Sequence, residues 1–165
     1  MMSFHRRDME WEFPFRSRYD SFCVFSCKSF KAGDYVHIGP HCSFSGPGAV
    51  VIGHFATFSH GIHVFTGSDD YSGESMTGPM VPDQYKTKFD RGDVKIGRGV
   101  IIGAGCVIMP GTTLNDYCAI GALSFVDRDV PSFEVWGGIP ARKLRDRSKR
   151  VEELEKEFLR AHPIG

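Results

Sequence analysis

The chain has 165 residues, of which 41% are apolar, and its 20 basic residues balance its 20 acidic residues. That apolar share is sufficient for a folded core and excludes a disordered chain. The zero net charge argues against a protein that binds nucleic acid or a membrane surface by bulk charge. Nineteen residues are glycine, well above the usual share of roughly 7%, which indicates many tight turns.

The cysteines and the apolar runs bear on the location of the protein. The five cysteines lack the paired spacing of a disulfide framework or a structural zinc site. No stretch has the apolar length of a membrane span or the pattern of a signal peptide. We therefore expect no membrane-spanning segment and a cytoplasmic location.

Residues 1–30 are rich in aromatic side chains. We interpret this segment as a cap on the repeats that follow, because the open end of a stack of repeats needs cover; a surface for an acceptor or a partner is the alternative. The aromatic residues are Phe4, Trp11, Phe13, Phe15, Tyr19, Phe22, Phe25 and Phe30.

From residue 31 to residue 131 a large apolar residue recurs every six positions, outside one insertion and a two-residue irregularity near Pro47 and Gly48. A small or slim residue often stands four positions after it. The recurring residues are Ile38, Phe44, Ile52, Phe58 and Val64, and then Ile96, Ile102, Ile108, Leu114, Ile120 and Val126. The small position holds Val36, Cys42, Ala56, Val100, Cys106, Thr112, Cys118 and Ser124.

A period of six fits neither a helix nor an alternating strand. Three such hexads close a triangular coil of about 18 residues, and stacked coils pair at about 4.8 Å into three parallel sheets around the large apolar residues. A β-sandwich, whose strands recur at roughly 8–12 residues, fits this spacing poorly. Cys106 and Cys118 stand in the small inward position, so we expect buried thiols and no nucleophilic role.

The run from Ile96 to Leu114 resembles the hexapeptide-repeat acyltransferases, and the segment 137–143 resembles the part that closes their β-helix. The resemblance covers about residues 30–147. It implies an all-β fold, a left-handed parallel β-helix that breaks the usual right-handed crossover rule, and a homotrimer with acetyl-CoA bound between neighbouring prisms. We divide this single domain into an aromatic cap at 1–30, a β-helix at 31–131 with a protruding loop at 70–93, and a cofactor-end segment with a C-terminal α-helix at 132–165.

The six-residue rhythm stops between Asp69 and Ile96, and long insertions on rigid scaffolds are usually functional. In the galactoside, maltose and streptogramin acetyltransferases, which this stretch resembles, the corresponding loop begins with a catalytic histidine; here Ser68 or Asp69 holds that position. The Asp-Asp-Tyr-Ser-Gly sequence at residues 69–73 resembles sugar O-acetyltransferase-like proteins of surface-polysaccharide or lipopolysaccharide biosynthesis. The expected substrate-binding residues are Ser68, Tyr71, Glu74 and Tyr85.

Acetyl transfer requires a well-placed nucleophile and a group that accepts its proton. Asp69 or Asp70 is a candidate base if burial raises its pKa, with the other binding sugar hydroxyls; solvated turn residues are the alternative for both. His60 and His63, expected to face outward, are rival bases. A sugar amine needs less help than a hydroxyl, because its pKa lies nearer to about 8.

The cofactor end is marked by basic residues, which make up six of the nine positions from 142 to 150. By the resemblance, Pro140 and Ala141 pack near the adenine end of coenzyme A, and Arg142 and Lys143 reach its phosphates, which Arg and Lys bind well. A solvated face before a helix is the alternative. The residues expected along the pantetheine arm stand at turns 18 residues apart in adjacent coils and are Gly103, Ala104, Gly121 and Ala122.

A helix is predicted from Ser148, as its N-cap, to about Ala161, with one apolar stripe formed by Val151, Leu154 and Phe158. We expect it to fold back on the prism or on a neighbour and to cover an open end.

The leading hypothesis is an acetyl-CoA-dependent transfer to a sugar or nucleotide-sugar hydroxyl or amine, by direct attack in a ternary complex. A non-catalytic β-helix scaffold subunit is one alternative. A carbonic-anhydrase-like zinc enzyme is another, but it would use three histidines across an interface. Since residues 64–161 contain no histidine, we expect no metal.

Overall fold

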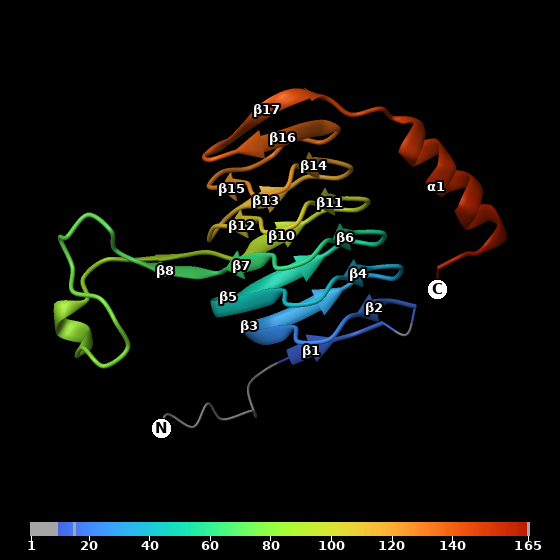
Figure 1. The fold of residues 1–165 in the computed structure, drawn as a ribbon. Helices are drawn as coiled ribbons and strands as arrows, with labels where there is room; N and C mark the ends of the chain where they lie inside the picture. Colours follow the sequence, from blue (N-terminus) through green and yellow to red (C-terminus); the bar gives the residue numbers. More distant parts are fainter. Residues whose placement is uncertain (1–9, 15, 165) are drawn as a thin grey trace.

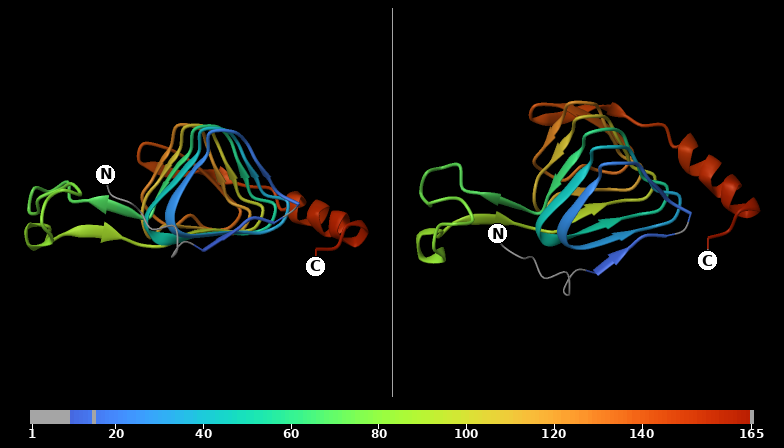
Figure 2. Two further views of the ribbon diagram at one scale, coloured as in Figure 1. Left: turned by 90° about the horizontal axis from the view of Figure 1, so that it is seen from below. Right: turned by 60° about the horizontal axis from the view of Figure 1, so that its bottom comes forward.

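The computed structural model describes residues 10–14 and 16–164, which form a triangular, left-handed parallel β-helix (Figures 1 and 2). The coils stack from the N-terminal end to the C-terminal end, and strands of successive coils pair in parallel. Ile102, for example, pairs with Phe58 of the preceding coil and with Ile120 of the following one. The predicted fold class and its six-residue register are therefore confirmed. Phe4 and Phe15 of the expected cap lie outside the described residues.

The strands form three faces. The first face contains β2 (Arg18–Tyr19), β4 (His37–Ile38), β6 (Thr57–Phe58), β11 (Ile101–Ile102), β14 (Ala119–Ile120) and β16 (Glu134–Gly138), with β17 (Ala141–Asp146) antiparallel to β16. The second face contains the first halves of β3 (Val24–Ala32) and β5 (Ser43–Ile52), followed by β7 (His63–Phe65), β12 (Val107–Ile108) and β15 (Phe125–Val126). The third face contains β1 (Glu10–Glu12), the second halves of β3 and β5, β10 (Val94–Ile96) and β13 (Thr113–Leu114).

The interior is a stack of the recurring apolar residues, each at most 3% exposed. The small positions are buried as well, at 2% or less. Burial raises the pKa of the Cys118 thiol to about 12 and raises that of Cys106. Both thiols therefore stay protonated and enclosed, as the repeat predicts. At the N-terminal end Phe13 packs on Tyr19, Phe25 and Phe30, with ring centroids 4.9, 5.2 and 5.4 Å away.

Three corners join the faces, and Figure 2 shows what each one bears. The free corner, between the first and second faces, bears neither a ribbon nor a helix. The ribbon corner, between the second and third faces, sends out the long excursion. The helix corner, between the third and first faces, lies beside the C-terminal helix. The turns of the free corner include residues 59–61, 103–105 and 121–123, stacked coil on coil.

The excursion begins at Gly67, not at the predicted residue 70. It leaves as an antiparallel ribbon of β8 (Gly67–Asp69) and β9 (Phe89–Arg91), with a short 3₁₀ helix, η2 (Asp83–Tyr85), in its tip. A hydrogen bond of 3.1 Å from Gly92 N to Thr66 O closes its base. The hexad pattern misses this start because residues 67–69 continue the strand spacing while they leave the prism.

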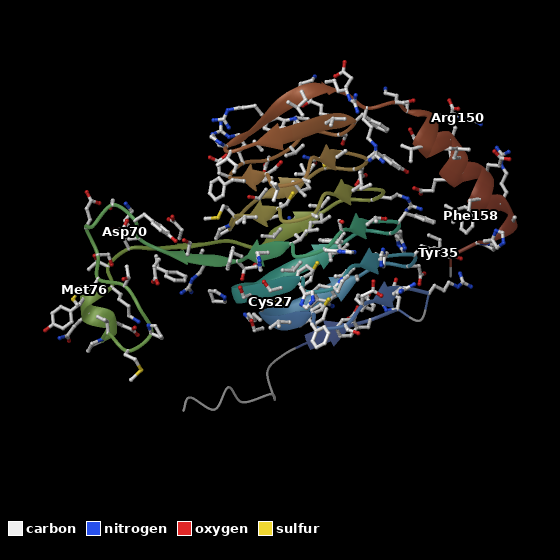
Figure 3. All side chains as sticks on the ribbon, viewed as in Figure 1. Cys27, Tyr35, Asp70, Met76, Arg150 and Phe158 are labelled. Carbon is white, nitrogen blue, oxygen red and sulfur yellow. The ribbon has the colours of Figure 1, made fainter. Side chains whose placement is uncertain are left out.

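The hairpin of β16 and β17 closes the C-terminal end, and α1 (Arg150–Ala161) follows. The helix is confirmed, although Lys149 holds the N-cap position and Ser148 Oγ accepts a hydrogen bond from Arg150 N at 3.2 Å. The expectation that it covers an open end is wrong. It runs along the helix corner, where Phe158 meets Tyr35 edge-on at 5.2 Å (Figure 3). No helix within residues 10–14 and 16–164 is long and apolar enough to cross a membrane.

Candidate functional site

Asp70 anchors the excursion. Its side chain is 2% exposed. It accepts hydrogen bonds from Ser72 N at 3.1 Å, Ser72 Oγ at 2.7 Å and Glu74 N at 3.0 Å, and it pairs with Lys88 Nζ at 3.2 Å. The Ser72 hydrogen bonds, with Lys88, hold the pKa of Asp70 well below its usual range. This is the reverse of the raised pKa expected for a base, because hydrogen bonding outweighs burial. Asp70 therefore has a structural role.

Asp69 is placed differently. In the ribbon it stands opposite Phe89, while Gly67 stands opposite Arg91 and Ser68 opposite Asp90. Directly opposed residues of an antiparallel pair point to the same face, so Asp69, Phe89 and Arg91 share one ribbon face. Asp69 is half-buried. Within the described part of the chain its carboxylate has neither a hydrogen-bond nor an ion-pair partner, so it is available to an acceptor.

A cavity of about 500 Å³ lies between the root of the ribbon and the second face. Ser68 and Tyr71, two of the expected substrate-binding residues, line it with Asp69. Glu74 and Tyr85 do not line it; both lie in the excursion between β8 and β9, and Figure 3 shows this part, with Asp70 and Met76 labelled, reaching away from the prism. The remaining lining residues are Phe65, Gly67, Val107, Met109 and Phe125.

The two histidines face outward, as predicted, and are both exposed. His63 lies on the second face, with Nδ1 2.7 Å from Ser43 Oγ. His60 lies in the free corner, where its carbonyl accepts a hydrogen bond from Gly105 N at 2.9 Å. His60 precedes β7 and Asp69 follows it, so these two candidates stand at opposite ends of one strand. They do not converge within one protomer.

The free corner brings the expected pantetheine-binding residues together. Leu123 N donates to Ala104 O at 2.8 Å, and Gly121 N donates to Trp136 O at 2.8 Å, so successive turns stack directly. A Cβ added at Gly103 would collide with the backbone of Ala122. Small residues here leave the backbone open to a thin ligand chain. Gly103, Ala104, Gly121 and Ala122 thus form one strip, which continues through His60 of the coil below.

The hairpin turn after β16 stands above this strip, since Gly138 N donates to Ser124 Oγ at 3.1 Å. Pro140 is exposed in the turn, and Ala141 is buried at 1%. Arg142 is exposed beside the turn. Phosphate groups at this end of the strip would therefore meet Arg142 first.

Three other basic residues of the run, Lys143, Arg147 and Arg150, already have partners. Lys143 Nζ lies 2.7 Å from both Glu134 Oε1 and Asp146 Oδ1. Arg147 is structural, because its guanidinium donates to three backbone carbonyls at the helix corner. To bind a phosphate of coenzyme A, Lys143 would have to break an ion pair with Glu134 or Asp146.

Phe89 and Arg91 are not among the residues to which the sequence pattern points, because the hexad rhythm carries no information about pairing inside an insertion. The sequence feature that could have indicated the ribbon is the pair of glycines at the two ends of the excursion, Gly67 and Gly92, where one strand leaves the prism and its partner strand rejoins it. Among the residues that the structure describes, no three His, Cys, Asp or Glu side chains gather as a metal site would require.

Comparison of the sequence and the fold with known proteins places the chain in a family. Residues 93–128 match the family described as bacterial transferase hexapeptide (six repeats). The dTDP-4-amino-4,6-dideoxy-D-glucose acyltransferase of Escherichia coli is 41% identical over 143 residues, which cover 86% of this chain and 74% of that protein. A putative lipopolysaccharide biosynthesis O-acetyl transferase of Escherichia coli K12, WbbJ, is 27% identical over 81% of this chain and 65% of its own length.

Solved structures of acyltransferases share the fold of this chain. A serine-to-alanine variant of AntD, an N-acyltransferase from Bacillus cereus, in complex with dTDP-4-amino-4,6-dideoxyglucose and coenzyme A, superposes with a TM-score of 0.84. It is 31% identical, and the match covers 94% of this chain and 86% of that chain. These similarities and the prism geometry confirm the resemblance seen in the repeats and the expected use of a coenzyme A thioester. The chain belongs to the hexapeptide-repeat acyltransferases.

Proposed function

We propose that this enzyme transfers an acetyl or similarly short acyl group from coenzyme A to the amine of a dTDP-linked 4-amino-4,6-dideoxyhexose. The 41% identity to the Escherichia coli acyltransferase named for that sugar carries the proposal. The fold match to an N-acyltransferase bound to the same nucleotide sugar supports it. Relatives named for lipopolysaccharide and colanic acid biosynthesis favour a role in making cell-surface polysaccharide, in the cytoplasm.

The absence of the loop histidine favours an amine acceptor over a hydroxyl. A hydroxyl needs strong base assistance, whereas an amine with a pKa near about 8 arrives partly deprotonated and needs positioning and a proton acceptor. Asp69, whose carboxylate is half-buried and unpaired within the described residues, is our candidate for that acceptor. The neutral amine attacks the thioester carbonyl and forms a C–N bond, the C–S bond breaks and coenzyme A leaves as its thiolate, and the proton that the nitrogen loses passes to the carboxylate.

Ser59 joins the proposed site. The AntD structures include variants at a serine and at an aspartate ten positions later. In this sequence one serine–aspartate pair has that separation, Ser59 and Asp69. Ser59 belongs to the free corner, beside His60, at the lower end of the proposed coenzyme A strip. Its hydroxyl is therefore a candidate for positioning the thioester.

Ser59 and Asp69 stand at opposite ends of β7, and this favours a site shared between protomers. If the ribbon corner of one protomer meets the free corner of the next, the ring closes with three equal sites. We accordingly propose a homotrimer. The coenzyme A strip would come from one protomer and Asp69 from its neighbour.

The test is thiol release from acetyl-CoA and from 3-hydroxybutyryl-CoA in the presence of dTDP-4-amino-4,6-dideoxyglucose. We expect turnover with this acceptor and none with its 4-hydroxy counterpart, dTDP-6-deoxyglucose. Turnover with the hydroxyl compound alone would establish O-transfer instead. Failure to bind either acyl-CoA, measured by calorimetry, would favour the scaffold alternative.

A further inference from the structure

A second cavity, of about 600 Å³, lies on the other side of the ribbon, toward the first coils. Its walls come from β3 and β5 of the prism and from the returning arm of the excursion, where Lys86, Phe89 and Arg91 line it. A Cβ on Gly67 would lie 2.6 Å from Pro47 and 2.8 Å from the Phe89 ring. The glycine thus lets Phe89 fold down against the prism and form part of the cavity wall.

The side chains from the excursion that line this cavity are an aromatic ring, two cations and one carboxylate, Asp83. The Phe89 side chain is 41% exposed, and the Arg91 guanidinium lies 5.7 Å from the centre of its ring. Across the described ranges, Arg91 has no carboxylate partner. Lys86 Nζ pairs with Asp83 at 2.9 Å, but Asp83 is 97% exposed, so that pair is weak in water and open to exchange. An exposed ring with an arginine beside it, in a cavity that a lysine with an exchangeable ion pair also lines, suits a flat base joined to phosphates.

We propose that this cavity is the nucleotide subsite, in which Phe89 stacks on the base and Arg91 and Lys86 bind the diphosphate of the acceptor. The proposal rests on the proposed function for its choice of a nucleoside diphosphate. The ribbon register lets Phe89 and Arg91 act together, because these two residues lie on one face of the ribbon and line the same cavity.

The test is calorimetric titration of the full chain with dTDP in the presence of saturating coenzyme A, which keeps dTDP out of the coenzyme strip. Phe89→Leu and Arg91→Gln should each raise the dissociation constant by about tenfold or more, whereas Phe89→Tyr should restore binding. Pyrophosphate should lose affinity with Arg91→Gln but not with Phe89→Leu.

Two variants serve as matched controls. Asp90→Asn changes the opposite face of the same ribbon. Arg16→Gln removes another arginine that stacks on an aromatic ring, 5.9 Å from the centre of Tyr35, at the helix corner. Both should leave the dissociation constant of dTDP within about twofold of the wild-type value.

The subsite is overturned if the wild-type chain fails to bind dTDP, or if Phe89→Leu and Arg91→Gln bind it as tightly as the wild type. It is also overturned if these variants change only the oligomeric state in sedimentation. The turnover assay separates this result from the proposed function. If the variants lose affinity for dTDP and the wild-type chain turns over no aminosugar, the subsite is supported and the proposed function is excluded. If both variants turn over the aminosugar normally with an unchanged KM, the proposed function is supported and the subsite is excluded.

Discussion

Asp69 and Asp70 are adjacent carboxylates with opposite surroundings. The Asp70 carboxylate accepts hydrogen bonds from Ser72 and Glu74 and pairs with Lys88, whereas the Asp69 carboxylate has no such partners within the described residues. A proton acceptor must be ionised and must also reach the substrate. Asp70 meets only the first condition, so Asp69 is the one of this pair that we propose as the proton acceptor.

Asp69→Asn should lower kcat at least about 100-fold and leave the KM for the acyl-CoA unchanged, because it removes the proton acceptor without touching the coenzyme strip. Steady-state kinetics with the dTDP-aminosugar checks this. Asp90→Asn, one strand away on the other ribbon face, is the matched control and should keep the wild-type kcat. Equal kcat values for Asp69→Asn and the wild type would exclude Asp69 as the base.

At the scale of elements, the repeat and the existence of an excursion were predictable, and the strand pairing inside the excursion was not. Hexads such as Ile102 to Ile108 predict their own geometry, because a large inward residue every six positions, with a small inward one four positions later, is typical of a three-sided coil. The ribbon depends on pairing between residues 67–69 and 89–91. These two segments are far apart in the sequence, so the six-residue repeat does not predict their pairing. Likewise the sequence predicted the apolar stripe of α1. It did not predict what the stripe packs against, because Tyr35 and Phe55, the partners of Phe158, are more than 100 residues away in sequence.

The order of the excursion should depend on the ionisation of Asp70. Its folded pKa is depressed below the unfolded value of about 3.9, so its stabilising effect is present above that value and is lost as the pH falls through the folded pKa. The protection factors of the Ser72 and Glu74 amides, which donate to this carboxylate, should be high near neutral pH and should fall progressively as the pH drops below about 4.

Asp70→Asn should quicken exchange at these two amides even at neutral pH, because the ion pair with Lys88 is lost. The Ile102 and Ile120 amides of the prism provide the internal reference and should exchange at the wild-type rate. Unchanged protection at Ser72 and Glu74 in the variant would show that the ribbon holds its tip without the carboxylate.

At the scale of the whole molecule, the three corners differ in what they offer a neighbour. The helix corner is covered by α1, through Phe158 on Tyr35 and Phe55. The ribbon corner sends β8 and β9 away from the prism, and the free corner has no element over it (Figure 2). In the proposed homotrimer the projecting arm of one protomer would meet the bare strip of the next, a head-to-tail contact that closes into a ring when its rotation closes.

A shared site makes a quantitative prediction for mixed trimers. Asp69→Asn removes the proposed base, and Ala104→Trp blocks the coenzyme strip, so each homotrimer should be inactive. In trimers assembled at random from equal amounts, a site has an intact Asp69 from one protomer and an intact strip from the next about one time in four. Mixing under conditions that exchange subunits should therefore restore about a quarter of the wild-type rate, measured as thiol release. If all groups of a site came from one protomer, the mixture would stay inactive, since every protomer would still carry one defect.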